Sequence, residues 1–463
     1  MEQNVFYETY GFLEDDLDQL LEEKKYQELR GKINTLNEAD IADYMQRLPD
    51  EQMLLVFRML HKDLAADAFA CLPVEEQQVL IDDFTDVELG DVLEDLHVDD
   101  VVDMLEELPA GVVRRVLKNT RPEQRSLINQ FLQYPENSAG SIMTPETLAV
   151  NRTMTVDDSF NYIRANGEDC EMFYVLYVID EVRHLEGVVT VKDLLMHPYE
   201  ALIGDIMETK VVKCTTTDDQ EDVAELLNRY DFLSLPVVDH ENRLVGMVTV
   251  DDAVDVMTEE TTEDIEKMAA IIPTEHSYFR TSIWDTWKSR TPWLLFLMIS
   301  ATFTSIIINT YESALAAWVA LTGFIPMLMD TSGNAGSQST VTVIRALSLG
   351  DIQFSQIFKV IWKEMRVAFA CGLTLAVVNF FKIYLVDGML FHNPQITFQI
   401  DLVVCVTLFF TVLFAQFVGC ILPMLADRIH LDPAVMASPL ITTIVDASSL
   451  LIYFQVASRL LGL

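Results

Sequence analysis

Hydrophobic and polar positions follow different patterns in the two parts of the chain. From residue 286 onward, long apolar runs carry few charges, and five of them approach or exceed the roughly 20 residues that a helix needs to cross a bilayer. We expect membrane spans at about 291–311, 314–344, 363–386, 402–426 and 433–460. Before residue 286 the apolar positions are sparser and periodic. The pattern predicts a soluble front part joined to an all-α, five-helix transmembrane domain over 291–463.

Residues 1–136 have the spacing of short amphipathic helices, as in VLEDLHVDDVVDMLEEL (92–108). Leu-Pro pairs recur at 48–49, 72–73 and 108–109, and proline is tolerated in the first turn of a helix but ends the preceding one. Short helices repeated in this way predict an acidic, all-α superhelical domain.

Residues 137–258 contain an internal repeat. GVVTVKDLL (187–195) recurs as GMVTVDDAV (246–254), and YVLYVID (174–180) as LSLPVVD (233–239). Ile142-Met143 also recurs, as Ile206-Met207. Short β-branched runs alternate with helical stretches, which predicts two α/β copies over 137–200 and 201–258.

Residues 259–290, beginning EETTEDIEKM, form a charged segment that leads into the first span. We expect a connecting helix here, which would couple the front part mechanically to the membrane domain. Glu259, Glu260, Glu263 and Asp264 lie within little more than one turn of it. Such a density of negative charge is unfavourable unless a cation is near.

Charge divides the chain at the same point. The net charge of −41 lies entirely in residues 1–285, which hold 22 Lys and Arg against 63 Asp and Glu, whereas the remainder holds 9 of each. Such a surface repels nucleic acid and anionic lipid and attracts cations, although acidic surfaces can also serve solubility alone. The six cysteines are scattered without a CxxC pair. They indicate a reducing compartment rather than a zinc site or a disulfide framework.

The basic residues orient the membrane domain. The chain shows no signal peptide, so the front part is expected in the cytoplasm. The inner flanks then hold Lys288, Arg290, Arg345, Lys359, Lys363, Arg366 and Arg428. The outer flanks hold only Lys382 and Arg459, which satisfies the positive-inside rule. With five spans, the C-terminus is expected on the side of the inner membrane opposite to the cytoplasm.

Two spans carry polar faces. In the second, Pro326, Asp330, Asn334 and Gln338 recur every four residues and share one face over about 18 Å of helix. In the fifth, Ser438, Thr442, Asp446 and Ser449 also fall on one face. The hydroxyl residues can serve helix packing. A lone carboxylate inside a span is by default a functional group, and Asp446 has no basic residue in its span before Arg459.

The types of ligand on these two faces limit which cation can bind. The two faces offer carboxylate, amide and hydroxyl oxygens without histidine or thiolate. Such oxygen ligands suit Mg²⁺, Ca²⁺ or Mn²⁺ rather than zinc or copper. Mg²⁺ gives up its waters reluctantly, so one carboxylate per subunit, helped by amides that hold the water shell, would suit a two-fold pore.

The segments IPMLMDTSGNAGSQSTVTVIRALSLGDI (325–352) and LDPAVMASPLITTIVDASSLLIYF (431–454), together with TEDIEKM in the connector, resemble the MgtE family of magnesium channels. The repeat resembles a tandem CBS pair. The resemblance runs over essentially the whole chain, including the order of the domains.

The resemblance implies a homodimer with a central pore in which Asp446 binds hydrated Mg²⁺, and cytosolic Mg²⁺ sites that hold the pore shut. By motif position the regulatory ligands would be Asp99, Asp103, Asp219, Glu221, Asp231, Asp252, Asp255, Glu260, Glu263 and Asp264. Around the pore aspartate, Asp330, Asn334, Gln338, Ser438 and Thr442 are the candidates. CBS pairs often bind adenine nucleotides such as ATP, and they also serve as dimerising discs without a ligand.

This chain departs from the family pattern at three places. Ser332 stands where the family usually has glycine, and Asp330 where a neutral residue is common. Ser448-Ser449 replaces the usual Thr-Gly after the pore aspartate. These departures bear on fine selectivity.

We therefore expect a Mg²⁺-selective channel or transporter of the cell membrane that is closed by Mg²⁺ on its cytosolic domains. Transport of another divalent cation, Co²⁺ or Mn²⁺, is the main alternative, and a membrane-anchored nucleotide sensor is a second. No nucleophile–base set or phosphate-binding loop indicates an enzyme.

Overall fold

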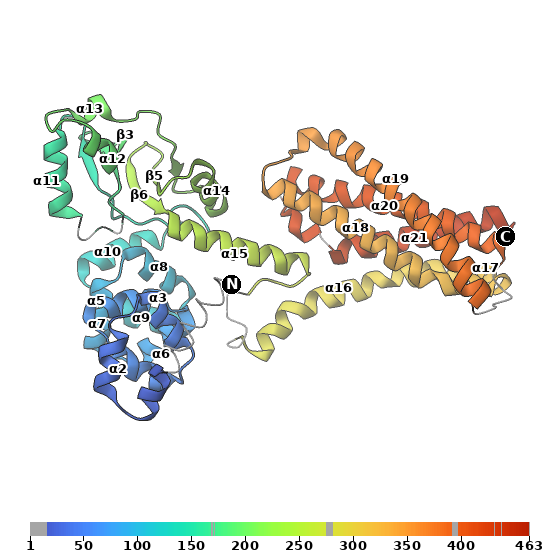
Figure 1. Cartoon of the computed structure of the whole chain (residues 1–463), viewed down its shortest axis with the longest axis horizontal. Helices are drawn as coiled ribbons and strands as arrows, with labels where there is room; N and C mark the ends of the chain where they lie inside the picture. The colour runs from blue at the N-terminus through green and yellow to red at the C-terminus, as the bar shows by residue number, and fades with distance from the viewer. Residues whose placement is uncertain are drawn as a thin grey trace. The chain divides into compact units, whose positions relative to one another are not determined.

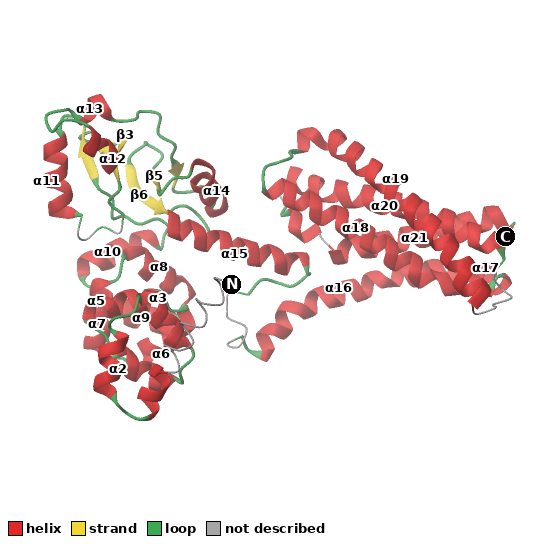
Figure 2. Ribbon diagram, in the orientation of Figure 1, coloured by secondary structure: helices red, strands yellow, loops and turns green. Residues whose placement is uncertain are grey.

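The computed structural model describes residues 16–167, 170, 172–274, 281–390, 397–429, 431–436 and 438–462. The chain divides into two compact units, Met1–Glu259 and Glu260–Leu463. Figure 1 labels their helices and strands, and Figure 2 colours them by type. The expected fold class is confirmed: a helical domain, two small mixed α/β sheets and a helical C-terminal region with long apolar helices.

The first part of the front unit is an array of helices of eight to ten residues. They are α2 (Tyr26–Ile33), α3 (Glu38–Gln46), α4 (Asp50–Phe57), α5 (Lys62–Ala70), α6 (Val74–Asp83), α7 (Asp86–Asp95), α8 (Val98–Glu107), α9 (Ala110–Asn119) and α10 (Pro122–Phe131). Helices two apart along the chain pack together, in the series α3, α5, α7, α9 and in the series α4, α6, α8, α10. Each helix therefore buries its apolar side against neighbours of the other turns, as in a superhelix.

The Leu-Pro pairs set helix starts. Pro49, Pro73 and Pro109 lie directly before α4, α6 and α9, each with φ between −59° and −55°. Before α7, Thr85 and Glu88 form a reciprocal capping box. These local signals explain why the short helices begin where they do.

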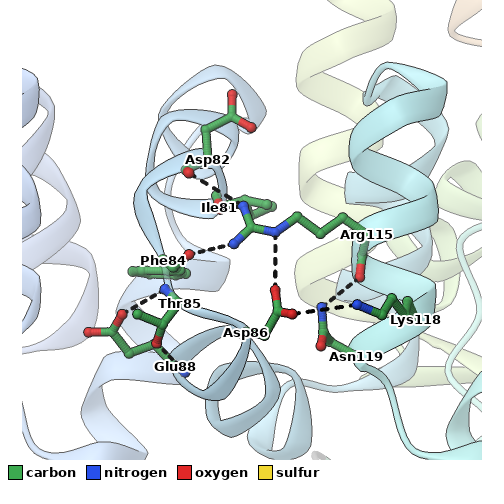
Figure 3. Close-up of polar contacts among 9 residues, drawn as sticks. All are labelled: Ile81, Asp82, Phe84, Thr85, Asp86, Glu88, Arg115, Lys118 and Asn119. Atoms are coloured by element: carbon green, nitrogen blue, oxygen red, sulfur yellow. Dashed lines mark hydrogen bonds and ion pairs between the residues drawn. The ribbon is translucent and has the colours of Figure 1, made fainter.

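Arg115 of α9 ties successive turns of the array together (Figure 3). Its guanidinium donates to the carbonyl oxygens of Ile81 and Phe84 at the C-terminal end of α6. It also lies 3.6 Å from the Asp86 carboxylate, which is 3.5 Å from Lys118. A cation at the end of α6 satisfies carbonyl groups that the helix itself leaves free.

The second part of the front unit holds two three-stranded sheets. The first has the order β1 (Ala149–Asn151), β2 (Val175–Ile179), β3 (Leu185–Thr190), and the second has the order β4 (Cys214–Thr215), β5 (Ser234–Val238), β6 (Leu244–Thr249). In each, the first pair is parallel and the second antiparallel. The helices of this part are α11 (Val156–Asn166), α12 (Val191–Met196), α13 (Ile203–Ile206) and α14 (Gln220–Tyr230).

The two copies exchange their opening segments. Thr144, which follows the first Ile-Met pair, bridges to Met247 in the second sheet, and Glu208 bridges back to Val188 in the first. A Cβ on Gly246 would lie 2.6 Å from the Thr144 carbonyl oxygen, so this position needs glycine. The repeat in the sequence therefore corresponds to two interlocked folds rather than two independent ones.

The expected connecting helix over 259–290 is shorter than predicted. Helix α15 runs over Val250–Met268 and ends there. Ala270 adopts φ 55°, and the Ile271 amide donates to the Glu266 carbonyl oxygen, a bond that closes the end of the helix. Pro273 follows. The next helix, α16, begins only at Ile283, and residues 275–280 lie outside the described part.

The second unit is a bundle of long helices. They are α16 (Ile283–Thr310), α18 (Ile325–Ser348), α19 (Ile357–Lys382), α20 (Phe398–Arg428) and α21 (Ser438–Leu461), with the shorter α17 (Glu312–Ala317), η1 (Val319–Phe324), η2 (Phe354–Gln356), η3 (Ile383–Leu390) and η4 (Pro433–Met436). The expected second span began at residue 314, but its helix starts at Ile325 because η1 and Pro326 set a new beginning.

Four helical stretches among the described residues are long and apolar enough to cross a membrane: Ile283–Thr310, Phe354–Val386, Phe398–Arg428 and Pro433–Leu461. Helix α18 has 24 residues, enough for a span, but it carries many polar side chains. It packs against both α20 and α21. A polar helix of this length held among apolar ones is where the predicted pore face lies.

Candidate cation sites

The predicted polar face of α18 is solvent-accessible in the isolated chain. Asp330, Asn334 and Gln338 are all accessible, whereas Ser332, Gly333 and Gly336 of the same helix are buried. The face is therefore free to line a passage or to meet a second subunit.

Asp446 lies on α21 close to Gly333 of α18. A Cβ on Gly333 would lie 3.3 Å from Thr442 Cγ2 and 3.9 Å from Asp446 Oδ1. The Asp330 carboxylate is close enough to Asp446 for the two charges to repel. No basic side chain among the described residues of the bundle forms an ion pair with Asp446. The structure thus brings Asp446, Thr442 and Asp330 to one junction of two helices.

The hydroxyl residues of α21 have other contacts. Thr442 Oγ1 donates to the Pro439 carbonyl oxygen at 3.0 Å. Ser449 is buried and its hydroxyl lies 2.8 Å from that of Ser332 on α18. The Ser332 hydroxyl in turn lies 2.6 Å from the Leu328 carbonyl oxygen. The side chain of Ser438, the first residue of α21, lies outside the described part. Two of the departures from the family pattern, Ser332 and Ser449, therefore bond to each other across the two helices.

In the front unit, α8 and the start of α15 bring carboxylates together. Asp99, Asp100 and Asp103 of α8 interact electrostatically with one another and with Asp252 of α15. Asp99 is only 5% exposed, and its Oδ1 has no hydrogen-bond partner in the described part of the chain. A buried carboxylate oxygen without a donor is a suitable ligand for a cation.

Burial and mutual repulsion raise the pKa values of this cluster. Burial, followed by the charge of Asp100, raises the pKa of Asp99 to about 7. Burial raises the pKa of Asp100 to about 6, and that of Asp252 to about 7 with the charge of Asp99 adding to it. The pKa of Asp103 is also raised, by burial first and then by the charges of Asp99 and Asp252.

Asp252 also has a local structural role. It accepts a hydrogen bond from Thr249, and the first copy has the same contact between Thr190 and Asp193. The first-copy pair is a capping box at the start of α12. Asp252 thus keeps the cap of its helix and in addition faces Asp99.

The other predicted ligands of the front unit are spread out. Asp219 is the N-cap of α14 and accepts from the Glu221 amide at 2.9 Å. Asp231 ends the same helix with φ 54°. About 18 Å of helix separates them, so one ion cannot bind both within one chain. Asp255 is exposed on α15.

In the second unit, the end of α15 carries the remaining predicted ligands. Glu260, Glu263 and Asp264 lie within its last three turns. Burial, followed by the charge of Asp432, raises the pKa of Asp264. Asp432 itself accepts a hydrogen bond from the Ala434 amide at 2.7 Å, at the start of η4.

Lys267 joins these carboxylates. Its ammonium nitrogen lies 2.7 Å from Asp432 Oδ2 and 2.8 Å from Glu263 Oε1. Partial burial opposes its charge, but the hydrogen bonds to Asp432 and Glu263 raise its pKa to about 12. The end of α15 is therefore tied to the turn from which α21 begins.

Within the described residues, no group of three or more His, Cys, Asp or Glu converges tightly enough to hold a metal ion. The carboxylates of α8 and α15 are close enough to repel one another, but their oxygens do not converge on one common metal position. Sequence reasoning missed Asp100 and Asp432. Asp100 could have been found from its place beside Asp99, whereas only the fold brings Asp432 to Lys267.

The second unit is a bundle of apolar helices in which Asp446 has no basic partner among the described residues. An acidic helical domain and an α/β pair precede it in the chain, and together these features define a membrane protein that attracts cations. Family models match the chain in the same order. The MgtE intracellular N domain matches residues 36–137, the CBS domain matches 139–200 and 203–259, and the MgtE model, described as a divalent cation transporter, matches 325–456.

The chain belongs to the MgtE family. It is 37% identical over 449 residues to the magnesium transporter MgtE of Thermus thermophilus, covering 96% of this chain and 98% of that one. It is 32% identical over 439 residues to the magnesium transporter MgtE of Bacillus subtilis, covering 95% of each. The expected family resemblance is confirmed.

Two solved structures resemble the front unit. The cytosolic domain of the Mg²⁺ channel MgtE in complex with ATP is 36% identical, with a TM-score of 0.50, and covers 52% of this chain and 99% of that one. The soluble part of a magnesium transporter is 28% identical, with a TM-score of 0.51, and covers 54% and 99%.

Proposed function

We propose that the chain is a Mg²⁺-selective channel or transporter that mediates magnesium entry across the cell membrane. Asp446 carries the proposal, because it is a carboxylate without a basic partner among the described residues, set against Gly333 of a polar helix and near a second carboxylate. The identity to magnesium transporters, which extends over nearly the full length of the chain, supports the choice of ion. Asp330, Asn334, Gln338, Ser438 and Thr442 are the other candidates for contact with the passing ion.

A homodimer would complete the pore. The accessible face of α18 offers Asp330, Asn334 and Gln338 from one chain, and a two-fold axis along that face would double each ligand. Mg²⁺ keeps several of its waters in protein sites, so amides that hold water are as useful there as direct ligands. In this arrangement the N-terminal unit lies in the cytoplasm and the C-terminus outside.

The cytosolic carboxylates would close the pore when Mg²⁺ is abundant. Repulsion among Asp99, Asp100, Asp103 and Asp252 disfavours the contact of α8 with α15 until a cation neutralises it. The ligand set Asp219, Glu221, Asp231, Asp255, Glu260, Glu263 and Asp264 would contribute further sites. Because α15 is continuous from Val250 to Met268 and Lys267 pairs with Asp432, an ordered α15 would act on the start of α21. Mg²⁺ need only bind the closed state a few kcal/mol better in total.

ATP is a second proposed ligand, at the CBS pair, supported by the related cytosolic domain that was crystallised with ATP. A CBS pair that only dimerises remains the alternative. Isothermal titration of the full chain with ATP, with and without Mg²⁺, distinguishes them, because a purely structural disc gives no saturable heat.

Mg²⁺ entry into proteoliposomes that hold a Mg²⁺-sensitive dye tests the transport function. We expect Asp446→Asn to lower the flux at least about ten-fold, because the one pore carboxylate on α21 loses its charge in a medium where charges are poorly screened. Asp427→Asn, at an exposed carboxylate near the end of α20, is the matched control and should conduct normally.

Equal flux through the wild type and Asp446→Asn would overturn the pore assignment. A wild type that passes Co²⁺ or Mn²⁺ but not Mg²⁺ would favour a transporter of another divalent cation, which the wider family description allows.

A further inference from the structure

A second carboxylate is buried in the membrane bundle, and the pore described above does not use it. Glu364 of α19 is 8% exposed. Carboxylates inside a bilayer are costly and are kept where they have a specific partner. Lys363 and Arg366 are its neighbours along the helix, but no ion pair joins Glu364 to a basic side chain in the described ranges.

The partner of Glu364 is a hydroxyl group on the pore helix. Ser339 Oγ of α18 donates to Glu364 Oε2 at 2.8 Å and lies 3.3 Å from the Gln416 carbonyl oxygen of α20. All three residues are buried. Ser339 therefore marks the point where three helices meet, and it directly follows Gln338, whose side chain is on the accessible face of the same helix.

Next to this point, α18 lies directly against α20. Thr340 Oγ1 is 3.0 Å from both the Gly336 and the Gly419 carbonyl oxygens. A Cβ on Gly419 would lie 2.5 Å from the Gly336 carbonyl oxygen. Small residues let the two backbones touch, as in membrane helix pairs generally. Such contact sets the distance between α18 and α20, whereas the Ser339–Glu364 bond ties the same stretch of α18 to a third helix, α19.

We propose that Glu364 is a positioning residue that fixes the rotation of α18 and thereby sets where Gln338 and Asn334 present their amides to the passing ion. The side chain is suited to this because its carboxyl oxygen accepts the Ser339 hydroxyl at a fixed place on α19. A rotation of α18 would move the amides relative to Asp446. Glu364 thus contributes to ion selectivity without touching the ion. This inference rests on the proposed transport of Mg²⁺.

The test compares Glu364→Ala, Glu364→Gln and Ser339→Ala in full-length protein in proteoliposomes. Mg²⁺ flux per protein is measured together with the Ca²⁺ concentration that halves it. Loss of one buried hydrogen bond should change that concentration by about five-fold in Glu364→Ala and in Ser339→Ala. The double variant should be no worse than Glu364→Ala, because both changes remove the same bond.

Glu364→Gln keeps an acceptor of the same shape and should stay within about two-fold of the wild type. Asp401→Asn is the control, since Asp401 is the other buried carboxylate of the described bundle and accepts from the Cys405 thiol of its own helix. It should leave the Ca²⁺ competition unchanged. The amount of folded protein after extraction, measured in parallel, separates a change in selectivity from a loss of fold.

Three outcomes would overturn the inference: wild-type Ca²⁺ competition in Glu364→Ala and Ser339→Ala, equal damage in Glu364→Gln and Glu364→Ala, or reduced yield with unchanged selectivity per folded protein. The second would assign the charge itself, rather than the hydrogen bond, to the pore. A wild type that passes no Mg²⁺ contradicts the proposed function instead, so the two failures are distinguishable.

Discussion

The two units treat their carboxylates in opposite ways. On α8 and α15 of the front unit, Asp99, Asp100, Asp103 and Asp252 are crowded so closely that burial and repulsion raise their pKa values. On α18 and α21 of the membrane unit, Asp446 meets a glycine, and Asp330 is the one carboxylate near it among the described residues.

The difference separates two tasks. A crowded cluster is unstable until a cation arrives, so binding releases free energy that can drive a conformational change. A single carboxylate attracts a cation without holding it tightly, which suits an ion that must leave again. The crowded carboxylates of the front unit therefore indicate a cation sensor, and the isolated carboxylate of the membrane unit indicates an ion pathway.

The largest effect is expected when the charges of the crowded cluster on α8 and α15 are removed. In Asp99→Asn with Asp252→Asn, both the repulsion and two candidate ligands are gone. We expect the Mg²⁺ response to be lost: proteolysis of residues 1–136 should differ less than about two-fold with and without Mg²⁺, against about ten-fold in the wild type.

Asp193→Asn is the matched control for that experiment. Asp193 makes the same capping contact in the first CBS copy that Asp252 makes in the second, so its loss removes the cap alone. A double variant that keeps the full Mg²⁺ response would show that the cluster is not the sensor.

A smaller effect is expected where the end of α15 is tied to the start of α21. Lys267→Glu and Asp432→Lys should each raise the Mg²⁺ concentration that halves the flux by about five-fold, because a partly buried ion pair is replaced by repulsion. The double variant reverses the pair but leaves acidic side chains at both 263 and 267, so it should recover only part of the loss.

The double variant also tells two roles of Asp432 apart. A reversed pair restores an electrostatic tie but cannot restore a metal ligand. A double variant that recovers nothing relative to either single variant would therefore assign Asp432 to Mg²⁺ rather than to Lys267.

The pH dependence of stability should differ with and without Mg²⁺. The folded front unit retains protons on Asp99 and Asp252 up to about pH 7, whereas the unfolded chain has lost them above about pH 4. Raising the pH through this window therefore lowers the free energy of unfolding, on the order of a few kcal/mol.

Thermal unfolding of the full chain in detergent at about pH 4.5 and about pH 8, on either side of most of this window, measures the effect with and without Mg²⁺. The loss of stability at the higher pH should be large with a chelator and small with Mg²⁺. Equal stability at both pH values without Mg²⁺ would mean that the carboxylates do not retain their protons in the folded protein.

The smallest effect on transport is expected at Arg115, which lies in the front unit but outside the acidic cluster. Arg115→Ala removes the cation at the end of α6 and should lower the free energy of unfolding of the front unit by about 2 kcal/mol. Flux and Mg²⁺ response should stay within about two-fold of the wild type. A lost Mg²⁺ response in this variant would mean that any weakening of the array, and not the cluster, governs closure.

The sequence predicts the features that depend on local patterns. The Leu-Pro pairs mark helix starts, the repeat marks two sheets of the same topology, and the polar face of α18 follows directly from its four-residue spacing. The predicted connecting helix over 259–290 ran past the real end of α15 at Met268, although Pro273 already limits a helix there. What the sequence does not give is the exact end, which the backbone at Ala270 sets.

Contacts between side chains that are far apart in the sequence are harder to predict than the polar face of a single helix. Ser332 and Ser449 stand 117 residues apart and look like two separate departures from the family pattern, but their hydroxyls bond to each other. Glu364 looks like one more charge at the end of a span until Ser339 is found beside it. Such contacts depend on how helices are rotated in the bundle, which periodicity leaves open.

The measurement that tests the account most directly is Mg²⁺ flux at low and high Mg²⁺ on the side of the front unit, made in one assay on three proteins. The wild type should conduct at low Mg²⁺ and close at high Mg²⁺. Asp446→Asn should not conduct at either concentration, and Asp99→Asn with Asp252→Asn should give the same flux at both. Normal conduction by Asp446→Asn, or normal closure of the double variant at high Mg²⁺, would contradict the division of the carboxylates into a passage and a sensor.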